Sequence, residues 1–402
     1  MLENIVFMQG VKTVKDIDLQ DKRVLIRVDF NVPMDDNLNI TDDTRIRAAI
    51  PTIHYCIDNG AKSVVLMSHF GQPKEIDNKF SLKNLLKRVE RLLDKPVQLF
   101  TNLEEASCEQ LQNLPVGTIA MIENTRFFTG ETKNDEELSK KFASLCDVYV
   151  NDAFGASHRK HSSTYGTAKN SKVAVAGLLM KKEIDSFAKA LTNPAKPMLL
   201  IVGGAKVSSK ITLLKNILGV VDKIVIGGAM SFTFLKALGY NMQKSLVEDE
   251  YLSEALEILK AAKEQSVNIY LPVDVATTND IKNPELIKIT TTQDIPTNFI
   301  AADIGPASIK LFEEVIRLSQ TIIWNGPMGI YEMDRFSRGT FAISHYVAEN
   351  YSYSIIGGGD TADAVERAGD KDNMSFISTG GGASLELLEG KILPGFEALN
   401  RI

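Results

Sequence analysis

The sequence predicts an α/β protein built from two doubly wound, Rossmann-like domains with parallel sheets. Short apolar segments alternate with helical segments along the whole chain. Near-continuous apolar strands are typical of parallel sheets that are buried on both faces by helices. At 402 residues the chain also exceeds what a single hydrophobic core usually organises, so two domains are expected.

Composition narrows the class of protein. Hydrophobic residues make up 44% of the chain and charged residues 24%, as in a globular protein. The net charge of −6 argues against a nucleic-acid-binding protein. The three widely spaced cysteines suit a reducing compartment. The first ten residues do not resemble a signal peptide, and no apolar run has membrane-spanning length, so we expect a cytoplasmic protein.

The first half of the chain contains strand and helix signals in alternation. Strands are predicted at residues 24–30, 63–67, 118–122 and 147–150. Helices are predicted at residues 82–93 and 136–145, and a further helix is expected to begin at the capping sequence Asp42-Asp43-Thr44. The carboxyl ends of parallel strands meet at one edge of a sheet, which is where ligands of such proteins bind.

Cationic side chains follow these strands and the first helix start: Arg45, His69, Arg126 and Arg159. A single arginine of this kind is as well explained as solvated surface. Four at the same edge of one sheet instead favour a pocket for a small, multiply charged anion.

An amphipathic segment at residues 181–191 ends at Asn193-Pro194. Its apolar residues recur at helical spacing, which also fits an ordinary core helix. Because it lies between two strand–helix series, we interpret it as the bridge between domains.

The second half of the chain is richer in glycine. Strands are predicted at residues 198–202, 223–226, 268–271, 321–324, 354–356 and 375–378, and five of them run into glycine clusters. Residues 303–306 are expected to open another helix. One such cluster is an ordinary tight turn, but five at one sheet edge would let the backbone approach a base, a ribose and phosphates closely.

Two lysines and one aspartate in this half are candidate ligand contacts. Lys206 and Lys210 are four residues apart and are predicted to share one face of a helix start, where backbone N–H groups favour anions. The segment lacks the ending of a P-loop, and an ordinary strand-to-helix turn is the alternative. Asp360 could contact Mg²⁺, cap the helix expected at residues 362–368, or do both.

An arginine-rich anion site on one domain and a glycine-rich nucleotide site on the other would suit phosphoryl transfer between two separately held substrates. The motifs resemble those of the phosphoglycerate kinase family, in the family's order and over essentially the whole chain. They are residues 27–33 (RVDFNVP), 151–155 (NDAFG), 203–207 (GGAKV), 324–327 (WNGP), 357–361 (GGGDT), 378–384 (STGGGAS) and 393–395 (LPG).

The resemblance implies a domain division and two substrate sites. It implies an N-terminal domain at residues 1–178 completed by the tail 390–402, an interdomain helix at 179–193 and a C-terminal domain at 194–389. The N-terminal domain would bind 3-phosphoglycerate or 1,3-bisphosphoglycerate through Asp29, Phe30, Asn31, Arg45, His69, Phe70, Gly71, Gln72, Arg126 and Arg159. The C-terminal domain would bind ADP or ATP through Lys210, Gly227, Gly228, Gly305, Asn325, Glu332, Gly358, Gly359, Asp360 and Thr361, with Mg²⁺ on Asp360.

The resemblance also implies a mechanism without a protein nucleophile. An acyl phosphate would exchange its phosphoryl group with ADP by in-line transfer after hinge closure. The catalytic groups would be Arg45, Lys206, Lys210 and the amides of Gly381 and Gly382. The partners are then small molecules, with no nucleic acid or membrane, and a monomer is expected.

One position departs from the family's pattern. After His69 the family usually reads Leu-Gly-Arg-Pro, whereas this chain has Phe70-Gly71-Gln72-Pro73. If that arginine contacts substrate, its loss costs on the order of 1.5–3 kcal/mol of binding, so weaker triose binding is expected. Two alternatives stay open: a nucleotide-binding regulator that has lost its chemistry, and a related kinase with another carboxylate acceptor.

Overall fold

The computed structural model describes residues 1–400, which divide into two compact units. The N-terminal unit comprises Glu3–Asp185 and the C-terminal segment from Ile392 onward. The C-terminal unit comprises Met1–Leu2 and Ser186–Lys391. The division falls inside helix α7 (Leu178–Thr192), so a separate connector at residues 179–193 stays a prediction.

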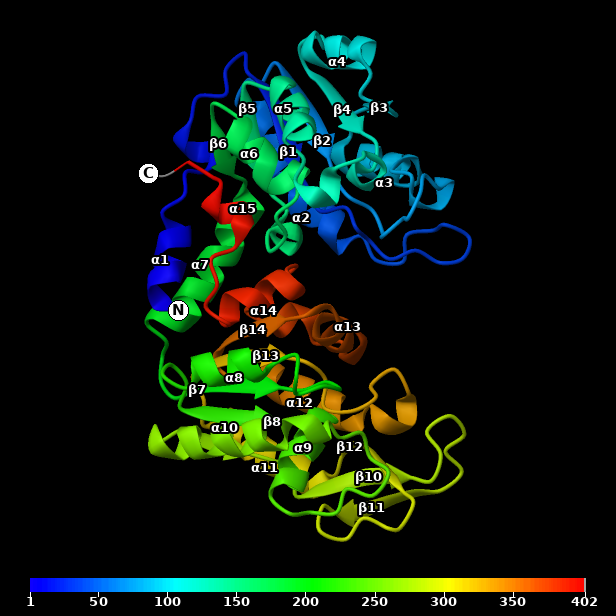
Figure 1. Ribbon diagram of the computed structural model, residues 1–402, viewed down its shortest axis with the longest axis vertical. Helices are drawn as coiled ribbons and strands as arrows, with labels where there is room; N and C mark the ends of the chain where they lie inside the picture. The colour runs from blue at the N-terminus through cyan, green and yellow to red at the C-terminus, as the bar shows by residue number, and fades with distance from the viewer. Residues whose placement is uncertain (401–402) are drawn as a thin grey trace. The chain divides into compact units, whose positions relative to one another are not determined.

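The N-terminal unit is built on a six-stranded parallel sheet with the order β3-β4-β2-β1-β5-β6 (Figure 1). Its strands are β1 (Arg23–Arg27), β2 (Ser63–Met67), β3 (Val97–Phe100), β4 (Thr118–Ile122), β5 (Val148–Asn151) and β6 (Ala174–Ala176). Arg27 pairs with Met67 on one side and Asn151 on the other, so β1, β2 and β5 end level with one another. Their following loops therefore start at one edge of the sheet.

The N-terminal unit also contains several helices. They are α1 (Leu2–Gln9), α2 (Thr44–Asp58), α3 (Lys83–Leu93), α4 (Glu105–Gln112), α5 (Glu136–Ser144), α6 (Thr167–Asn170) and α15 (Pro394–Glu397). In α3 the buried residues Leu85, Val89 and Leu93 are four apart, which places them on one face of the helix. At the start of α2, Asp43 is the N-cap residue, but its carboxylate pairs with Arg47 and Arg88 instead of capping.

The C-terminal segment completes this unit (Figure 1, red). Gly395 N–H donates to Ser157 O at 2.8 Å, and the rings of Phe154 and Phe396 meet edge to face. Asn400 then pairs with Ala174 of the edge strand β6, with N–O distances of 2.8 and 2.7 Å. The last described residues of the chain thus hydrogen-bond along the outer strand of the sheet.

The C-terminal unit has its own six-stranded parallel sheet, with the order β15-β14-β13-β7-β8-β9. Its strands are β7 (Met198–Val202), β8 (Lys223–Ile226), β9 (Asn268–Tyr270), β13 (Thr321–Asn325), β14 (Tyr353–Gly357) and β15 (Phe376–Ile377). Asn325 pairs with Val202 and with Gly357, so the glycine-containing loops again start level. Together with the first sheet, this confirms the predicted parallel α/β architecture.

The helices of the C-terminal unit flank this sheet. They are α8 (Ile211–Ile217), α9 (Met230–Ala237), α10 (Leu252–Glu264), α11 (Pro306–Arg317), α12 (Arg338–Glu349), α13 (Gly359–Ala368) and α14 (Gly382–Leu388). The core beneath them is centred on the fully buried Trp324 and Phe312. No helix within residues 1–400 is both long and apolar enough to cross a membrane.

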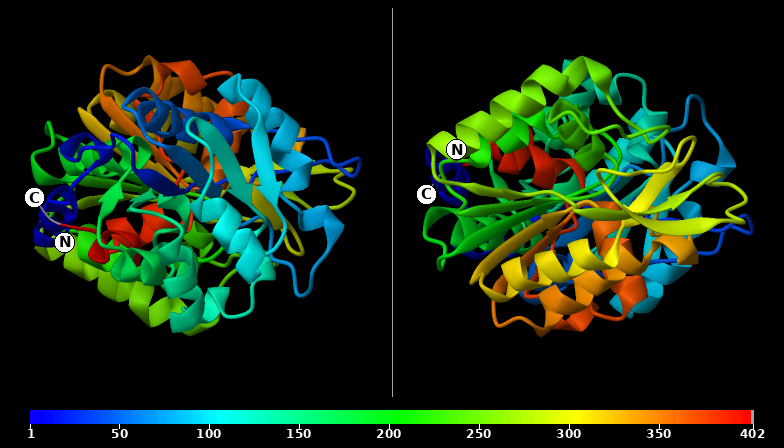
Figure 2. Two further views of the ribbon diagram at one scale, coloured as in Figure 1. Left: turned by 90° about the horizontal axis from the view of Figure 1, so that it is seen from above. Right: turned by 90° about the horizontal axis from the view of Figure 1, so that it is seen from below.

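A small antiparallel sheet was not predicted. It joins β10 (Asp274–Thr278), β11 (Ile287–Thr291) and β12 (Ile300–Ile304) in the order β11-β10-β12 (Figure 2, right, yellow). The edge strand β11 reads Ile-Lys-Ile-Thr-Thr, and its β-branched residues favour a strand. It is largely exposed, so it lacks the continuous apolar run by which the other strands were predicted. The expected helix start at residues 303–306 is present, with Pro306 at the first helical position and Asp274 accepting from Ala307 N and Ser308 N.

Two local predictions about helix starts are wrong. Lys206 and Lys210 do not share a helix face, because residues 207–210 form a turn and α8 begins only at Ile211. Asp360 is not an N-cap but lies in the first turn of α13, whose N-cap is Gly358. With a φ of 93°, Gly358 allows the helix to start immediately after β14.

Candidate functional sites

The predicted anion-binding residues lie on loops that follow four neighbouring strands, β4, β2, β1 and β5, and on the first turn of α2. Arg126 follows β4, His69 follows β2, Asp29 follows β1 and Arg159 follows β5, while Arg45 is the second residue of α2. The level strand ends bring these side chains to one edge. We call the set of Arg27, Asp29, Arg45, His69, Arg126 and Arg159 the arginine cluster.

Asp29 orients Arg45. The Arg45 Nη1 atom donates to Asp29 Oδ2 at 3.2 Å and to Asn31 O at 3.1 Å. Burial of Asp29 opposes its ionisation, but the charges of Arg45, His69 and Arg27 outweigh burial and lower the pKa of Asp29. About a third of the Arg45 side chain is exposed (30%), so it is positioned yet still accessible to a ligand.

Arg27 forms the buried floor of the cluster. Its Nε donates to Ser163 Oγ at 2.9 Å, and its Nη2 lies 3.3 Å from His69 Nδ1. Burial, supported by Arg27, Arg126 and Arg159, lowers the pKa of His69 to about 3, although Asp29 opposes this. His69 is therefore neutral at pH 7, even though its Nδ1 lies 3.8 Å from Asp29 Oδ1.

Positive charge is left uncompensated on the β4 and β5 loops. Burial lowers the pKa of Arg126, and the positive charges of Arg159 and Arg27 lower it further. The negative charge of Glu131 opposes this shift but does not cancel it. Burial and Arg126, Arg27 and Arg159 also lower the pKa of His161 to about 4. Among residues 1–400, the buried Nε of Arg126 has no hydrogen-bond acceptor. A buried cationic donor without an acceptor is the group that an anionic ligand would satisfy.

The other predicted substrate residues differ in exposure. The Phe30 side chain is fully buried in the core, and its N–H donates to Ser68 Oγ. Asn31 Oδ1 accepts from Gly71 N at 2.8 Å, and Phe70 N donates to Asn124 Oδ1. Gln72 is exposed. A cavity of about 190 Å³ adjoins this segment, lined by Asn31, Val32, Met34, Leu38, Phe70, Gly71, Lys79 and Phe80.

Sequence reasoning did not assign Arg27 or Glu131 to this region. Glu131 accepts from Ser163 Oγ at 2.5 Å and from Ser163 N at 2.9 Å, and burial raises its pKa although Arg27 opposes this. Arg27 is the last residue of the buried strand β1. The only sequence feature that could have pointed to a role there is that a charged residue ends an otherwise apolar strand. A charged residue there is rarely buried without a specific partner.

The glycine loops of the C-terminal unit bind mainly one another. Gly203 N donates to Asn325 O, Gly204 N to Pro327 O and Gly228 N to Met328 O. A Cβ atom on Gly326 would lie 2.3 Å from Gly203 O, and one on Gly203 would lie 2.1 Å from Pro327 O. At these positions glycine is required because three backbone segments touch.

Lys210 is buried beneath these loops. Its Nζ donates to Gly203 O at 2.6 Å and to Asn325 O at 2.7 Å. Burial lowers the pKa of Lys210 to about 7, although the charge of Asp360 opposes this shift. The lysine thus holds the β7 and β13 loops together and lies within the electrostatic field of Asp360.

Some of the remaining residues predicted to bind nucleotide or to act in catalysis are buried, and others are exposed to solvent. Thr361 is fully buried and its Oγ1 accepts from Gly326 N at 2.7 Å, and Asn325 is also buried. Gly227 and Gly305 lie against Met328 and Asp274. By contrast, Lys206, Glu332, Gly359 and Asp360 are exposed.

The glycine positions that face open space are the ones suited to ligand contact. A Cβ atom on Gly359 or Gly381 would meet no atom within 4 Å. Gly381 is the N-cap of α14 and Gly382 is its first residue. Backbone N–H groups at a helix start favour phosphate.

A metal site is supported only by Asp360. Within residues 1–400 no group of three or more His, Cys, Asp or Glu side chains is placed to hold a metal ion. Mg²⁺ commonly binds through one or two carboxylates together with substrate phosphates. The single exposed carboxylate of Asp360 fits that donor set only when a nucleotide is present.

Comparisons with known proteins give a consistent family. The family model described as Phosphoglycerate kinase matches residues 14–391. A protein named Phosphoglycerate kinase from Wolinella succinogenes is 67% identical over 401 residues, covering 100% of both chains. One from Helicobacter hepaticus is 65% identical over 397 residues, covering 99% of this chain and 98% of that protein.

Solved structures agree in fold. The structure of phosphoglycerate kinase from Coxiella burnetii has a TM-score of 0.87 and 40% identity, covering 96% of this chain and 98% of that chain. The crystal structure of the Pyrococcus horikoshii OT3 enzyme has a TM-score of 0.84 and 30% identity, with the same coverage.

Proposed function

The chain belongs to the phosphoglycerate kinase family, and from that premise we propose which residues perform the reaction. The reaction is the reversible transfer of a phosphoryl group between 1,3-bisphosphoglycerate and ADP, which yields 3-phosphoglycerate and ATP. It belongs to glycolysis and gluconeogenesis, and the enzyme is a phosphotransferase with a carboxyl group as acceptor.

We propose that the arginine cluster binds the phosphoglycerate. The observation that carries this proposal is the unsatisfied buried Nε of Arg126 among Arg27, Arg159 and Arg45. Guanidinium groups match phosphate and carboxylate geometry, and their charges suit a small molecule with several negative groups. Asp29, Asn31 and His69 would contact its polar groups, while Phe30, Phe70, Gly71 and Gln72 shape the segment around it.

The nucleotide is assigned to the C-terminal unit. Lys210 and Asn325 would lie under the phosphates, the exposed Glu332 would take the ribose, and Gly358 to Thr361 would border the phosphate chain. Gly227, Gly228 and Gly305 would support the loops around the base. Asp360 would hold Mg²⁺, which would supply positive charge to offset that of the nucleotide phosphates.

The catalytic assignment rests on charge and position. The carboxylate of 3-phosphoglycerate or the β-phosphate of ADP is itself the nucleophile, so no covalent enzyme intermediate is required. Arg45, Lys206, Lys210 and the amides of Gly381 and Gly382 would stabilise the transferring phosphoryl group. We propose that the two units close by a hinge motion, because transfer to water is avoided only when both substrates are enclosed.

A coupled assay of ATP consumption with 3-phosphoglycerate tests the proposal. Wild-type protein is compared with Arg45→Ala, with and without Mg²⁺. We expect activity that requires Mg²⁺ and falls at least a hundredfold in the variant, whereas MgATP binding is unchanged. Arg47→Ala is a matched control, because Arg47 lies on the same helix, and its side chain is more exposed and pairs with Asp43.

Two outcomes would contradict the residue assignment. Full activity of Arg45→Ala would remove Arg45 from the reaction. Normal nucleotide binding by a wild-type protein without activity would favour the regulator alternative, and a screen of other carboxylates would then test for a different acceptor.

We also propose that the enzyme is monomeric and acts in the cytoplasm. The three free cysteines, Cys56, Cys108 and Cys146, support a reducing compartment. Light scattering coupled to size-exclusion chromatography tests the monomer, for which 44.3 kDa is expected.

A further inference from the structure

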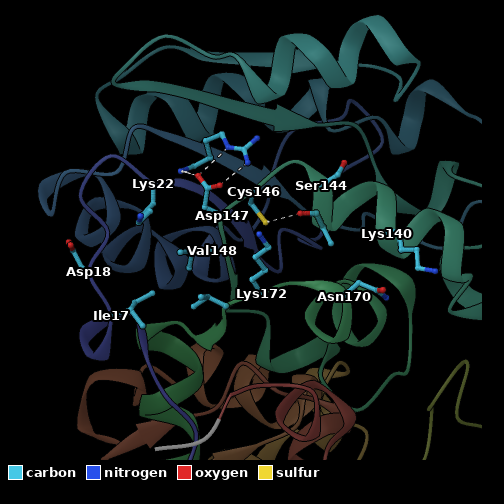
Figure 3. A pocket seen from close by; sticks show the side chains of 13 residues that line it. Ile17, Asp18, Lys22, Lys140, Ser144, Cys146, Asp147, Val148, Asn170 and Lys172 are labelled. Carbon is cyan, nitrogen blue, oxygen red and sulfur yellow. Dashed lines mark hydrogen bonds and ion pairs between the residues drawn. The ribbon is translucent and has the colours of Figure 1, made fainter.

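The N-terminal unit contains a cavity of about 770 Å³ that the proposed function does not use (Figure 3). It is formed by the segment before β1, the end of α5, the start of β5 and the segment between α6 and β6. Its lining includes Ile17, Lys22, Ala143, Cys146, Lys172 and Val173.

This cavity lies at the opposite edge of the sheet from the arginine cluster. Arg23 and Val148 are the first residues of β1 and β5, whereas Arg27 and Asn151 are the last. Strands of this length span roughly 13 Å at about 3.3 Å per residue. A ligand in the cavity would therefore not occupy the phosphoglycerate site.

The cavity carries an excess of positive charge. Arg23 and Asp147 neutralise each other through two contacts of 2.7 and 3.1 Å, and Lys140 pairs with Glu136. Among the described residues, Lys22 and Lys172 form no ion pair, and Asp18 is the only other acid in the lining. A local excess of lysine in a chain of net charge −6 would attract anions.

The rest of the lining is apolar or neutral. Ile17, Ala143, Val148 and Val173 contribute apolar surface. Cys146 adds no charge, because burial raises the pKa of its thiol to about 12. Figure 3 shows Lys172 reaching toward Cys146 and Lys140 directed away from the other labelled side chains. Cavities of several hundred Å³ are typical of small-molecule sites, and this one combines an apolar part with a larger charged and polar part.

We propose that this cavity is a second ligand site, which binds a small organic anion with an apolar body. The anionic group, a carboxylate, sulfonate or phosphate monoester, is held by Lys22 and Lys172. The apolar body lies against Ile17, Ala143 and Val173. Asn170 and Ser144 supply hydrogen bonds at the rim.

The test uses 8-anilinonaphthalene-1-sulfonate, which has a sulfonate on an aromatic body. Its fluorescence is titrated with the full chain saturated with 3-phosphoglycerate and MgADP, so that both substrate sites are blocked. We expect one bound probe per chain. The affinity should fall at least tenfold in the double variant K22E/K172E and in Ala143→Trp, which fills the cavity.

A matched double variant controls for charge. K83E/K87E changes two exposed lysines of α3 by the same amount outside the cavity, so it should bind the probe like wild type. Thermal unfolding of every variant confirms that it is folded, and the probe's contacts are located by NMR shifts of the Val148 and Val173 methyl groups.

Three results would overturn the proposal. They are absence of probe binding when the chain is saturated with both substrates, equal affinity in K22E/K172E and wild type, and methyl shifts confined to other residues. The lysines could instead only balance the carbonyl ends of α5 and α6. In that case K22E/K172E lowers the unfolding temperature and leaves probe affinity unchanged, which also refutes the site.

Discussion

Arg27 and His69 contact each other in the floor of the arginine cluster, with the guanidinium Nη2 3.3 Å from the imidazole Nδ1. A guanidinium can only donate hydrogen bonds, so Nδ1 must accept and the ring proton resides on Nε2. Arg27 thus fixes the tautomer of His69. The imidazole is left as a neutral donor through Nε2.

This tautomer predicts how substitutions of His69 behave. In His69→Gln the amide nitrogen can reach the position of Nε2, whereas in His69→Asn it reaches only that of Nδ1. We expect KM for 3-phosphoglycerate to rise less than fivefold in the first variant and more than tenfold in the second. Because the pKa of His69 is about 3, KM should show no His69 titration between pH 5 and 8. A titration in that range that disappears in His69→Gln would contradict the neutral imidazole.

Lys210 predicts proton uptake on nucleotide binding. Its pKa is lowered from 10.5 to about 7 by burial, so at pH 8 it is mostly neutral in the free enzyme. Nucleotide phosphates nearby would raise that pKa again, and the enzyme would take up close to one proton. Calorimetry of MgADP binding at pH 8 in two buffers of different ionisation enthalpy measures this uptake. Lys210→Met should bind without it, and equal uptake in both proteins would exclude Lys210 as its source.

The same lowered pKa predicts a stability trend. Between pH 7 and 10.5 the unfolded chain binds more protons at Lys210 than the folded chain, so this residue's contribution to stability increases with pH. The unfolding free energy of wild type, relative to Lys210→Met, should rise across that interval. Urea unfolding of both proteins at pH 7 and pH 9.5 measures it, and a relative decrease would contradict the assignment.

Gly326 and Gly359 are predicted to have different roles, the first in packing and the second in ligand binding. Gly326 has a φ of 102°, and a Cβ atom there would lie 2.3 Å from Gly203 O, whereas one on Gly359 meets no atom within 4 Å. Gly326→Ala should lose about 2–4 kcal/mol of unfolding free energy. Gly359→Ala should change stability by less than about 1 kcal/mol and act on KM for MgATP instead. Equal stability losses in the two variants, measured by urea unfolding, would refute this distinction.

The burial of Asp152 predicts that its contribution to the unfolding free energy depends on pH. It is fully buried and accepts from the α7 amides of Leu179 at 2.9 Å and Met180 at 3.3 Å. Burial raises its pKa from 3.8 to about 7, although Thr52 and these amides oppose the rise. Between pH 4 and 7 the folded chain holds the extra proton, so the contribution of Asp152 to stability falls as pH rises.

Asp152→Asn should remove this contribution. The unfolding free energy of wild type minus that of the variant should decrease by about 3 kcal/mol between pH 4 and pH 7. Asp147→Asn is a useful comparison, because Arg23 lowers the pKa of Asp147 and the same difference should not decrease. A flat difference for Asp152→Asn would show that the carboxylate is ionised throughout.

Gln72 predicts a gain of function. It is exposed on the loop that follows β2, three residues after His69, where the family usually has arginine. Gln72→Arg adds a charge-assisted donor worth on the order of 1.5 kcal/mol. KM for 3-phosphoglycerate should therefore fall about tenfold with little change in kcat, and an unchanged KM would show that this position does not contact substrate.

Strands such as β2, β7 and β13 were predictable because they are fully buried runs whose apolar residues are visible without any structure. The edge strands β3 and β6 of the first parallel sheet were not predicted, because they are only four and three residues long. The β10–β12 sheet was missed because β11 is an exposed edge strand whose β-branched residues do not form a continuous apolar run. Strand pairing at a surface depends on partners that are distant in sequence.

The candidate sites were predictable to different degrees. Side-chain chemistry at strand ends and at the start of α2 predicts roles for Arg126, Arg159 and Arg45, and these roles stay predictions. The packing of Gly203, Gly228 and Gly326 on one another is a property of three loops at once. The burial of Arg27 depends on Ser163 and His69, which are 136 and 42 residues away along the chain. No local pattern carries that information.

The pairing of Asn400 with Ala174 has a consequence for biosynthesis. The ribosome delivers residues 392–400 only after the roughly 200 residues that follow Asp185 have been made. At about 5–20 residues per second, the nascent N-terminal unit waits on the order of 10–40 s with the outer edge of β6 unpaired at that position. An exposed strand edge is a site for incorrect pairing, so the unit emerging first from the ribosome is the one that is finished last.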